Sequence, residues 1–116
     1  MQLNMLFGNL YFIPDWRITT DSMGTYFANT LGAQRYVIVS NVDGMHARWP
    51  DSGPPIPSLG IEELQSLPSS KLDSAFPFFF RRYPSNTVIV NGRYPERVSA
   101  AIRGDRTIGT EIRLPP

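Results

Sequence analysis

The 116-residue sequence contains no cysteine, one histidine and one lysine. The absence of cysteine excludes a disulfide framework and any thiolate nucleophile or thiolate metal site. His46 alone cannot form a histidine-rich metal centre, and we expect it to be a loop side chain rather than a ligand or a base. Lys71 is the one compact ammonium that could contact a phosphate, and a solvated surface lysine is the alternative.

Long hydrophobic runs and an excess of charge of one sign are also missing. No stretch approaches the roughly 18 apolar residues of a membrane-spanning helix, and the first residues lack the basic start and apolar core of a signal peptide. A formal net charge of +1 gives no general attraction to nucleic acid or to an anionic membrane. We therefore expect one cytoplasmic domain without a nucleic-acid or membrane partner.

The spacing of apolar and turn residues predicts alternating helices and strands. A helix is expected over 20–31, closed by Gly32, and β-branched runs at 36–39 and 87–90 predict strands buried on both faces. The other expected elements are a strand or loop edge over 6–13, a loop over 46–60, short helices over 60–67 and from 69 or 70 to 78–83, a helix over 95–103 closed by Gly104, and a strand over 107–112. This order predicts an α/β fold with a mainly parallel sheet covered by helices.

Polar residues gather at the start of the first predicted helix. Thr19, Thr20, Asp21 and Ser22 bring three hydroxyls and a carboxylate to a position where free amides and the helix dipole favour phosphate or carboxylate ligands. Asp21 could instead orient a cationic catalytic group or a magnesium-bound phosphate. The alternative for all four residues is that they only cap the helix.

A second polar stretch, 40–45, follows the first predicted strand, at the end where open α/β sheets bind ligands. Asp43 could accept a hydrogen bond from a ribose hydroxyl or hold a magnesium-bound water, and Gly44 would let the backbone approach a ligand closely. An ordinary Asp-Gly turn is the alternative. Asn91-Gly92 stands in the same position after the second strand, as a further anion or base contact or as a plain turn.

Taken in order, several segments resemble the C-terminal half of the amino acid kinase family, which includes aspartate, acetylglutamate, uridylate and isopentenyl phosphate kinases. The segments that carry the resemblance are Thr20-Asp21-Ser22, Leu31-Gly32-Ala33, Val42-Asp43-Gly44-Met45, Val90-Asn91-Gly92, Gly104 and Gly109-Thr110-Glu111-Ile112. Within the family, Trp16 and the segments 71–73 and 91–97 most resemble an archaeal and methylotroph branch that includes the kinase of methanofuran synthesis.

The resemblance implies an αβα sandwich of the amino acid kinase type, represented here by its C-terminal half. In the family this half binds ATP, with magnesium, while the N-terminal half binds the phosphoryl acceptor. Asp21 matches the aspartate that orients catalytic lysines, and Thr19 and Thr20 match substrate contacts. The positions that match nucleotide contacts are Ser40, Asn41, Val42, Asp43, Gly44 and Met45, with Lys71 as a loose substitute for a family lysine.

The glycine-rich phosphate loop of the family and its lysine are not found in the sequence. Because phosphoryl transfer depends on positioning and charge neutralisation, we expect 1–116 to be a single partial kinase domain that is inactive by itself. It would pair with an N-terminal half or form a homo-oligomer. The alternatives are a non-catalytic nucleotide-binding or regulatory module and an inactive gene fragment.

Overall fold

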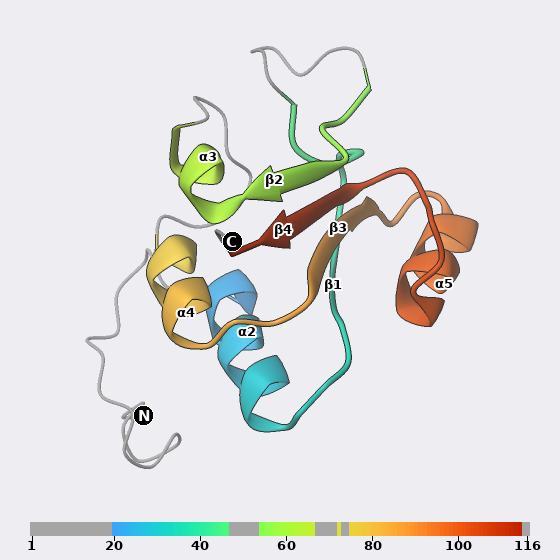
Figure 1. Ribbon diagram of the computed structural model, residues 1–116. Helices are drawn as coiled ribbons and strands as arrows, with labels where there is room; N and C mark the ends of the chain where they lie inside the picture. Colours follow the sequence, from blue (N-terminus) through green and yellow to red (C-terminus); the bar gives the residue numbers. More distant parts are fainter. Residues whose placement is uncertain (1–19, 47–53, 67–71, 73–74, 115–116) are drawn as a thin grey trace.

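The computed structural model describes residues 20–46, 54–66, 72 and 75–114 (Figure 1). The predictions for 6–13, Thr19 and Lys71 therefore lie outside the described residues. The elements follow in the order α2 (Thr20–Thr30), β1 (Tyr36–Ser40), β2 (Ser58–Gly60), α3 (Ile61–Ser66), α4 (Phe76–Arg82), β3 (Thr87–Asn91), α5 (Pro95–Arg103) and β4 (Thr110–Arg113).

The four described strands form one sheet in the order β1-β3-β4-β2. β1 runs parallel to β3, β2 runs parallel to β4, and β3 and β4 are antiparallel. The predicted α/β fold with a mainly parallel sheet is thus confirmed. Because β1 and β3 pair in register from Tyr36↔Thr87 to Ser40↔Asn91, both strands end at the same edge of the sheet.

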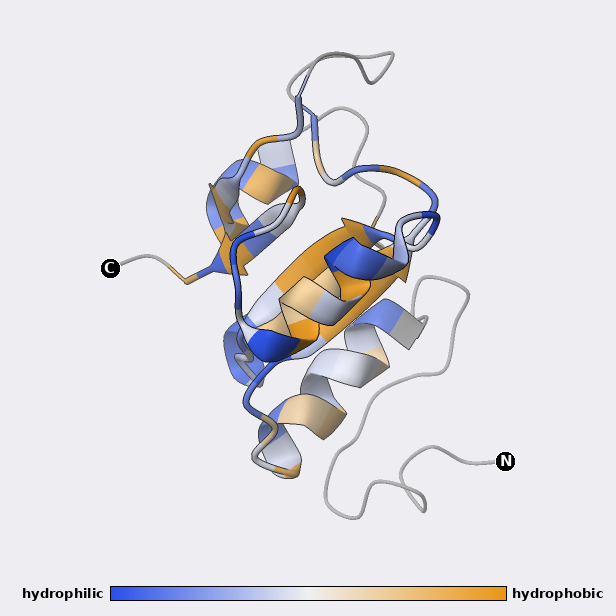
Figure 2. Ribbon diagram, turned by 90° about the vertical axis from the view of Figure 1, so that its right-hand side faces the viewer, coloured by the Kyte–Doolittle hydropathy of each residue, from blue (hydrophilic) through white to orange (hydrophobic). Residues whose placement is uncertain are grey.

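Helices cover both faces of the sheet, with α2 and α4 on one side and α5 on the other (Figure 1). Figure 2 shows α5 in front of the hydrophobic strands. The core lies on the α4 side, where isoleucines of the inner strands meet α3 and α4. Its buried residues are Ile38, Met45, Leu59, Ile61, Leu64, Leu72, Phe76, Phe80, Ile89 and Ile112. No helix among the described residues is long and apolar enough to cross a membrane.

Two glycines close helices as the sequence predicts. Gly32 has φ +67° and Gly104 has φ +82°, in the left-handed region that glycine occupies without steric cost. After α2, the Ala33 amide donates to the Ala28 carbonyl at 2.9 Å, and after α5 the Asp105 amide donates to Ala100 at 2.9 Å. These bonds satisfy carbonyls that the helix ends leave without partners.

One prediction about burial is wrong. β1 was expected to be buried on both faces, but Val39 is 56% exposed. The Val39 side chain lies against Gly92, so closely that a Cβ added to Gly92 would be 2.5 Å from Val39 Cγ1. Because glycine has no side chain, Gly92 does not shield Val39 from solvent. β1 is also an edge strand of the sheet as far as the structure describes it.

Some element boundaries also differ from the predictions. The predicted loop 46–60 contains β2, a three-residue strand whose partner β4 lies far along the chain. Such a strand depends on its pairing partner, because a Ser-Leu-Gly sequence has little β preference of its own. The helix expected from 69 or 70 begins at Phe76 instead, and Pro77 stands in its first turn, where a missing N–H costs nothing. The last strand begins at Thr110 rather than at residue 107.

We predict that Phe76→Ala lowers the free energy of unfolding by about 3–5 kcal/mol, because it empties a fully buried position of the core. Phe78→Ala is the matched control in the same helix, since Phe78 is 63% exposed, and its effect should stay within about 0.5 kcal/mol. Urea unfolding followed by circular dichroism measures both. Equal losses in the two variants would contradict the core described above.

Candidate functional site

The candidate site lies where β1 and β3 end. The turn that follows β1 carries Asp43, and Asn91 is the last residue of β3. The Gly92 amide donates to the Ser40 carbonyl at 2.8 Å, which ties the two turns together. Polar groups that are far apart in the sequence therefore meet at the carboxyl edge of the parallel pair, the usual ligand position in such sheets.

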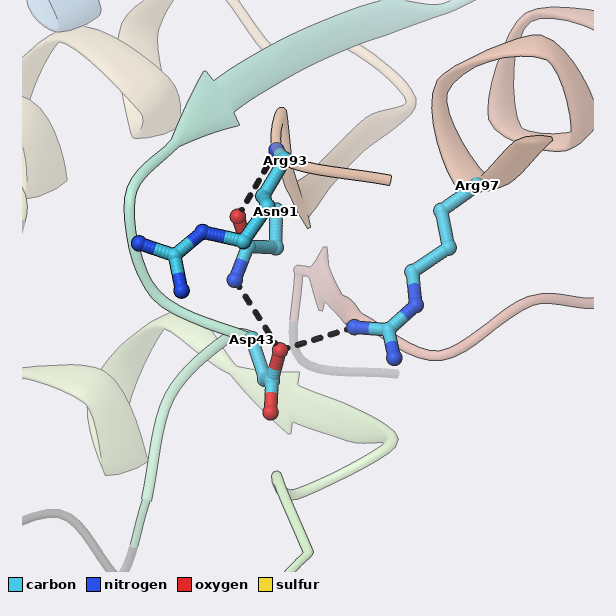
Figure 3. A network of polar contacts seen from close by, with 4 residues as sticks. All are labelled: Asp43, Asn91, Arg93 and Arg97. Carbon is cyan, nitrogen blue, oxygen red and sulfur yellow. Dashed lines mark hydrogen bonds and ion pairs between the residues drawn. The ribbon is translucent and has the colours of Figure 1, made fainter. Parts of the chain in front are cut away.

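Asp43 is the centre of a cluster that it forms with Asn91 and Arg97 (Figure 3). Its Oδ1 accepts hydrogen bonds from Asn91 Nδ2 at 3.1 Å and from Arg97 Nη1 at 2.7 Å. Asn91 is buried, and its Oδ1 accepts from the Arg93 amide at 2.9 Å. Both ends of the amide are thus in use, which determines its orientation. Asp43 Oδ2 has no hydrogen-bond partner among the described residues, and the Asp43 side chain is 41% exposed.

The electrostatics of the cluster favour the ionised carboxylate. Hydrogen bonds from Asn91 and Arg97 lower the pKa of Asp43, burial opposes them, and the charges of Arg97 and His46 lower it further. The Arg97 guanidinium lies 3.9 Å from the centre of the Tyr94 ring, and the Arg97 side chain is only 16% exposed. Arg97 is therefore held from two sides, by an aromatic face and by a carboxylate.

The turn is anchored on β4 through Thr110. The Met45 amide donates to Thr110 Oγ1 at 2.8 Å, and that hydroxyl donates to the Ile56 carbonyl at 2.6 Å. Gly44 has φ +151°, and a Cβ there would lie 2.5 Å from Thr110 Oγ1. The absence of a side chain at Gly44 thus lets the backbone lie close to Thr110.

His46 is buried, with 7% of its surface exposed, although the sequence predicts a loop side chain. Its Nδ1 has no hydrogen-bond partner within the part of the chain that the structure describes. A buried polar atom without a partner costs about 1–3 kcal/mol, so such atoms are rare in folded proteins. The sequence carried no signal for it apart from its place two residues after Asp43-Gly44.

The other predicted site residues lie apart from the cluster or outside the described residues. Asp21 lies next to Tyr36, whose hydroxyl donates to the Asp21 carbonyl at 3.1 Å, and Ser22 is buried. Asn41 is exposed, and Val42 is half-buried. The described structure therefore brings Asp43 together with Asn91, and the roles of Asp21, Thr19, Thr20 and Lys71 stay predictions.

Arg97 is the residue of the cluster that sequence reasoning missed as a site residue. It lies in the first turn of α5, three positions after Tyr94, a spacing that brings two side chains to one side of a helix. That spacing could have suggested the contact with Tyr94. The contact with Asp43 depends on the pairing of β1 with β3, which sequence spacing does not contain.

Two hollows lie elsewhere on the described surface. One, of about 480 Å³, is lined by residues that include Asn29, Pro84 and Leu114, and the other, of about 560 Å³, by residues that include Arg35, Ser58 and Glu111. Neither is lined by a member of the Asp43 cluster. Within the described part of the chain, no group of three His, Asp or Glu side chains could hold a metal ion.

We predict that Gly44→Ala destabilises the fold more than Gly32→Ala does. Both positions have positive φ, and this conformation costs a non-glycine residue about 1–3 kcal/mol. A Cβ at residue 32 meets nothing within 4 Å, whereas at residue 44 it meets Thr110, which is buried and bonded on both sides. Thermal unfolding of the two variants measures the difference, and an equal loss would show that Thr110 moves aside freely.

Comparisons with known proteins agree with the fold and with the resemblance of the motifs. The family model described as "Amino acid kinase family" matches residues 8–79. The chain is 32% identical over 97 residues to [5-(aminomethyl)furan-3-yl]methyl phosphate kinase of Methanocaldococcus jannaschii, covering 84% of this chain and 44% of that protein. It is 32% identical over 103 residues to acetylglutamate kinase of Frankia casuarinae, covering 84% of this chain and 28% of that protein.

Among solved structures, uridylate kinase from Archaeoglobus fulgidus matches with a TM-score of 0.66 and 23% identity, covering 83% of this chain and 47% of that one. UMP kinase from Ureaplasma parvum matches with a TM-score of 0.66 and 14% identity, covering 82% of this chain and 40% of that one. At these identities the likeness shows the fold. The chain spans less than half of the length of each of these four relatives. Because the family model matches more than half of the chain, the chain belongs to the amino acid kinase family.

Proposed function

We propose that this chain forms the ATP-binding part of a magnesium-dependent kinase that phosphorylates a small molecule. Membership in the amino acid kinase family supports a phosphotransferase role. The observation that carries the proposal is the turn after β1, where Asp43 is partly exposed and its Oδ2 has no hydrogen-bond partner among the described residues, at the carboxyl end of a parallel strand pair.

The free oxygen of Asp43 suits a nucleotide. Asp43 Oδ2 can accept a hydrogen bond from a ribose hydroxyl or from a metal-bound water, because Oδ1 is already occupied by Asn91 and Arg97. The proposed nucleotide contacts extend over the whole turn, Ser40, Asn41, Val42, Asp43, Gly44 and Met45.

The residues of the site fit magnesium only as a partner of the nucleotide. The described side chains form no three-ligand group for a metal ion, and Mg²⁺ often reaches a protein through substrate phosphates, one or two carboxylates and several waters. Asp43 Oδ2 is the carboxylate oxygen that could contact such a water. When bound, the ion would neutralise phosphate charge during transfer.

The remaining roles follow from the family and belong to the same proposal. Asp21 would orient a lysine supplied by another polypeptide segment, Thr19 and Thr20 would contact the phosphoryl acceptor, and Lys71 would contact a phosphate. The acceptor is a small molecule, and a phosphorylated aminomethylfuran is the first to test because of the named activity of the Methanocaldococcus jannaschii relative. The kinase would act in the cytoplasm, by pairing with an acceptor-binding half or as a homo-oligomer.

We predict that the chain binds MgATP and that Asp43→Ala weakens this binding by about tenfold or more, as expected for a lost hydrogen bond to a charged group. Asp105→Ala is the matched control, because Asp105 is an exposed aspartate paired with Arg103 at 2.9 Å. Isothermal titration calorimetry measures both variants. Failure of the folded chain to bind MgATP, or equal binding by Asp43→Ala, would contradict the proposed nucleotide site.

We also predict that magnesium-dependent phosphoryl transfer from ATP requires a second polypeptide that supplies the acceptor-binding half of a family member. Asp21→Ala should then reduce turnover at least about a hundredfold, as the loss of a positioned catalytic group does, while MgATP affinity stays unchanged. A coupled assay of ADP release measures this. MgATP binding without turnover in any such mixture would favour a non-catalytic nucleotide-binding module.

A further inference from the structure

The Asp43 carboxylate has two oxygens with different surroundings. Oδ1 accepts two hydrogen bonds, from Asn91 at 3.1 Å and from Arg97 at 2.7 Å. Oδ2 has no such partner in the described part of the chain, and Figure 3 shows it on the side of the carboxylate away from both donors. Two donors on one oxygen fix the rotation of the carboxylate, so its second oxygen has a defined direction.

The position of Arg97 is itself determined by α5. Tyr94 precedes the helix, Pro95 begins it, and Arg97 lies in the first turn. The Tyr94 ring supports the guanidinium at 3.9 Å, and the side chain retains 16% exposure. A planar guanidinium can stack flat on a ring while its N–H groups donate sideways to a carboxylate, a geometry that the compact ammonium of lysine lacks.

We propose that Arg97 is a positioning residue of the nucleotide site: supported by Tyr94, it holds Asp43 Oδ1 so that Oδ2 points at the ligand. The inference rests on the proposed function for the identity of the ligand. It assigns to α5 a part in binding, because α5 carries Arg97 while the proposed nucleotide contacts lie in the turn after β1. Asn91 cannot replace Arg97, since its amide is neutral and already donates to the same oxygen.

Three charged or titratable groups stand around Asp43 and Asn91. Arg97 comes from α5, Arg93 from the connection between β3 and α5, and His46 from the turn of Asp43 itself. In Figure 3 the Arg93 guanidinium lies on the other side of Asn91 from Arg97, and it has no hydrogen bond or ion pair in the described part of the structure. Of the arginines that the structure describes, Arg97 alone donates to the carboxylate, and its loss removes that bond.

The first test is the titration of Asp43, followed through its side-chain carboxyl carbon by NMR in the wild-type chain and in Arg97→Met. Hydrogen bonds from Asn91 and then from Arg97 lower the pKa of Asp43, so this pKa should rise in the variant, while the bond from Asn91 remains. Arg103→Met is the control, because it removes an arginine of the same helix that pairs with Asp105 at 2.9 Å. It should leave the Asp43 titration unchanged.

The second test is MgATP affinity across pH 4–7, measured by calorimetry on the same chains. In Arg97→Met, binding should weaken by about tenfold at pH 7, the effect of one lost charged hydrogen bond, and further toward pH 4 as Asp43 takes up its proton. Arg97→Lys is the second variant if Arg97→Met does not fold. It keeps the charge, so the pKa of Asp43 should stay low, but affinity should still fall because the planar donor is lost.

The outcomes separate the inference from the proposed function. A merely structural role of Arg97 predicts a lower melting temperature with an unchanged Asp43 titration and unchanged MgATP affinity of the folded chain, and that result would overturn the inference. If the wild-type chain does not bind MgATP, the proposed function fails, and the titration of Asp43 alone decides whether Arg97 positions the carboxylate.

Discussion

The in-register parallel pairing of β1 with β3 is the constraint on which the candidate site depends. It places Ser40 opposite Asn91, so the turns after both strands leave the sheet at the same edge. Asp43 then reaches Asn91 at the end of β3 and Arg97 in the first turn of α5. Because side chains alternate between the two faces of a strand, a shift of one residue in this register would turn Asn91 to the other face and separate it from Asp43.

Buried polar groups hold this edge in place, and most of them are satisfied. Asn91 uses both ends of its amide, and Thr110 both accepts and donates a hydrogen bond. Such pairing is the rule for polar groups that leave water, because an unpaired one carries the full cost of desolvation. His46 Nδ1 departs from the rule in the part of the chain that the structure describes.

Asp43 unites two interpretations that its sequence context left open. An ordinary turn residue would form hydrogen bonds only within the protein, whereas a ligand contact would face outward. In the structure, Oδ1 accepts hydrogen bonds from within the protein, and Oδ2 remains available to a ligand, since 41% of the side chain is exposed.

By itself, the sequence determined the local structure that short-range chemistry controls. Glycines after α2 and α5, β-branched runs in β1 and β3, and the Asp-Gly turn are signals contained within a few residues, and so were the motifs that indicated the family. The tertiary structure alone decided which of these segments meet. β2 exists through its pairing with β4, Val39 is exposed because Gly92 lies against it, and Arg97 reaches Asp43 because β3 pairs with β1. These contacts join residues about 50 positions apart, and at that separation local propensity carries no information about the partner.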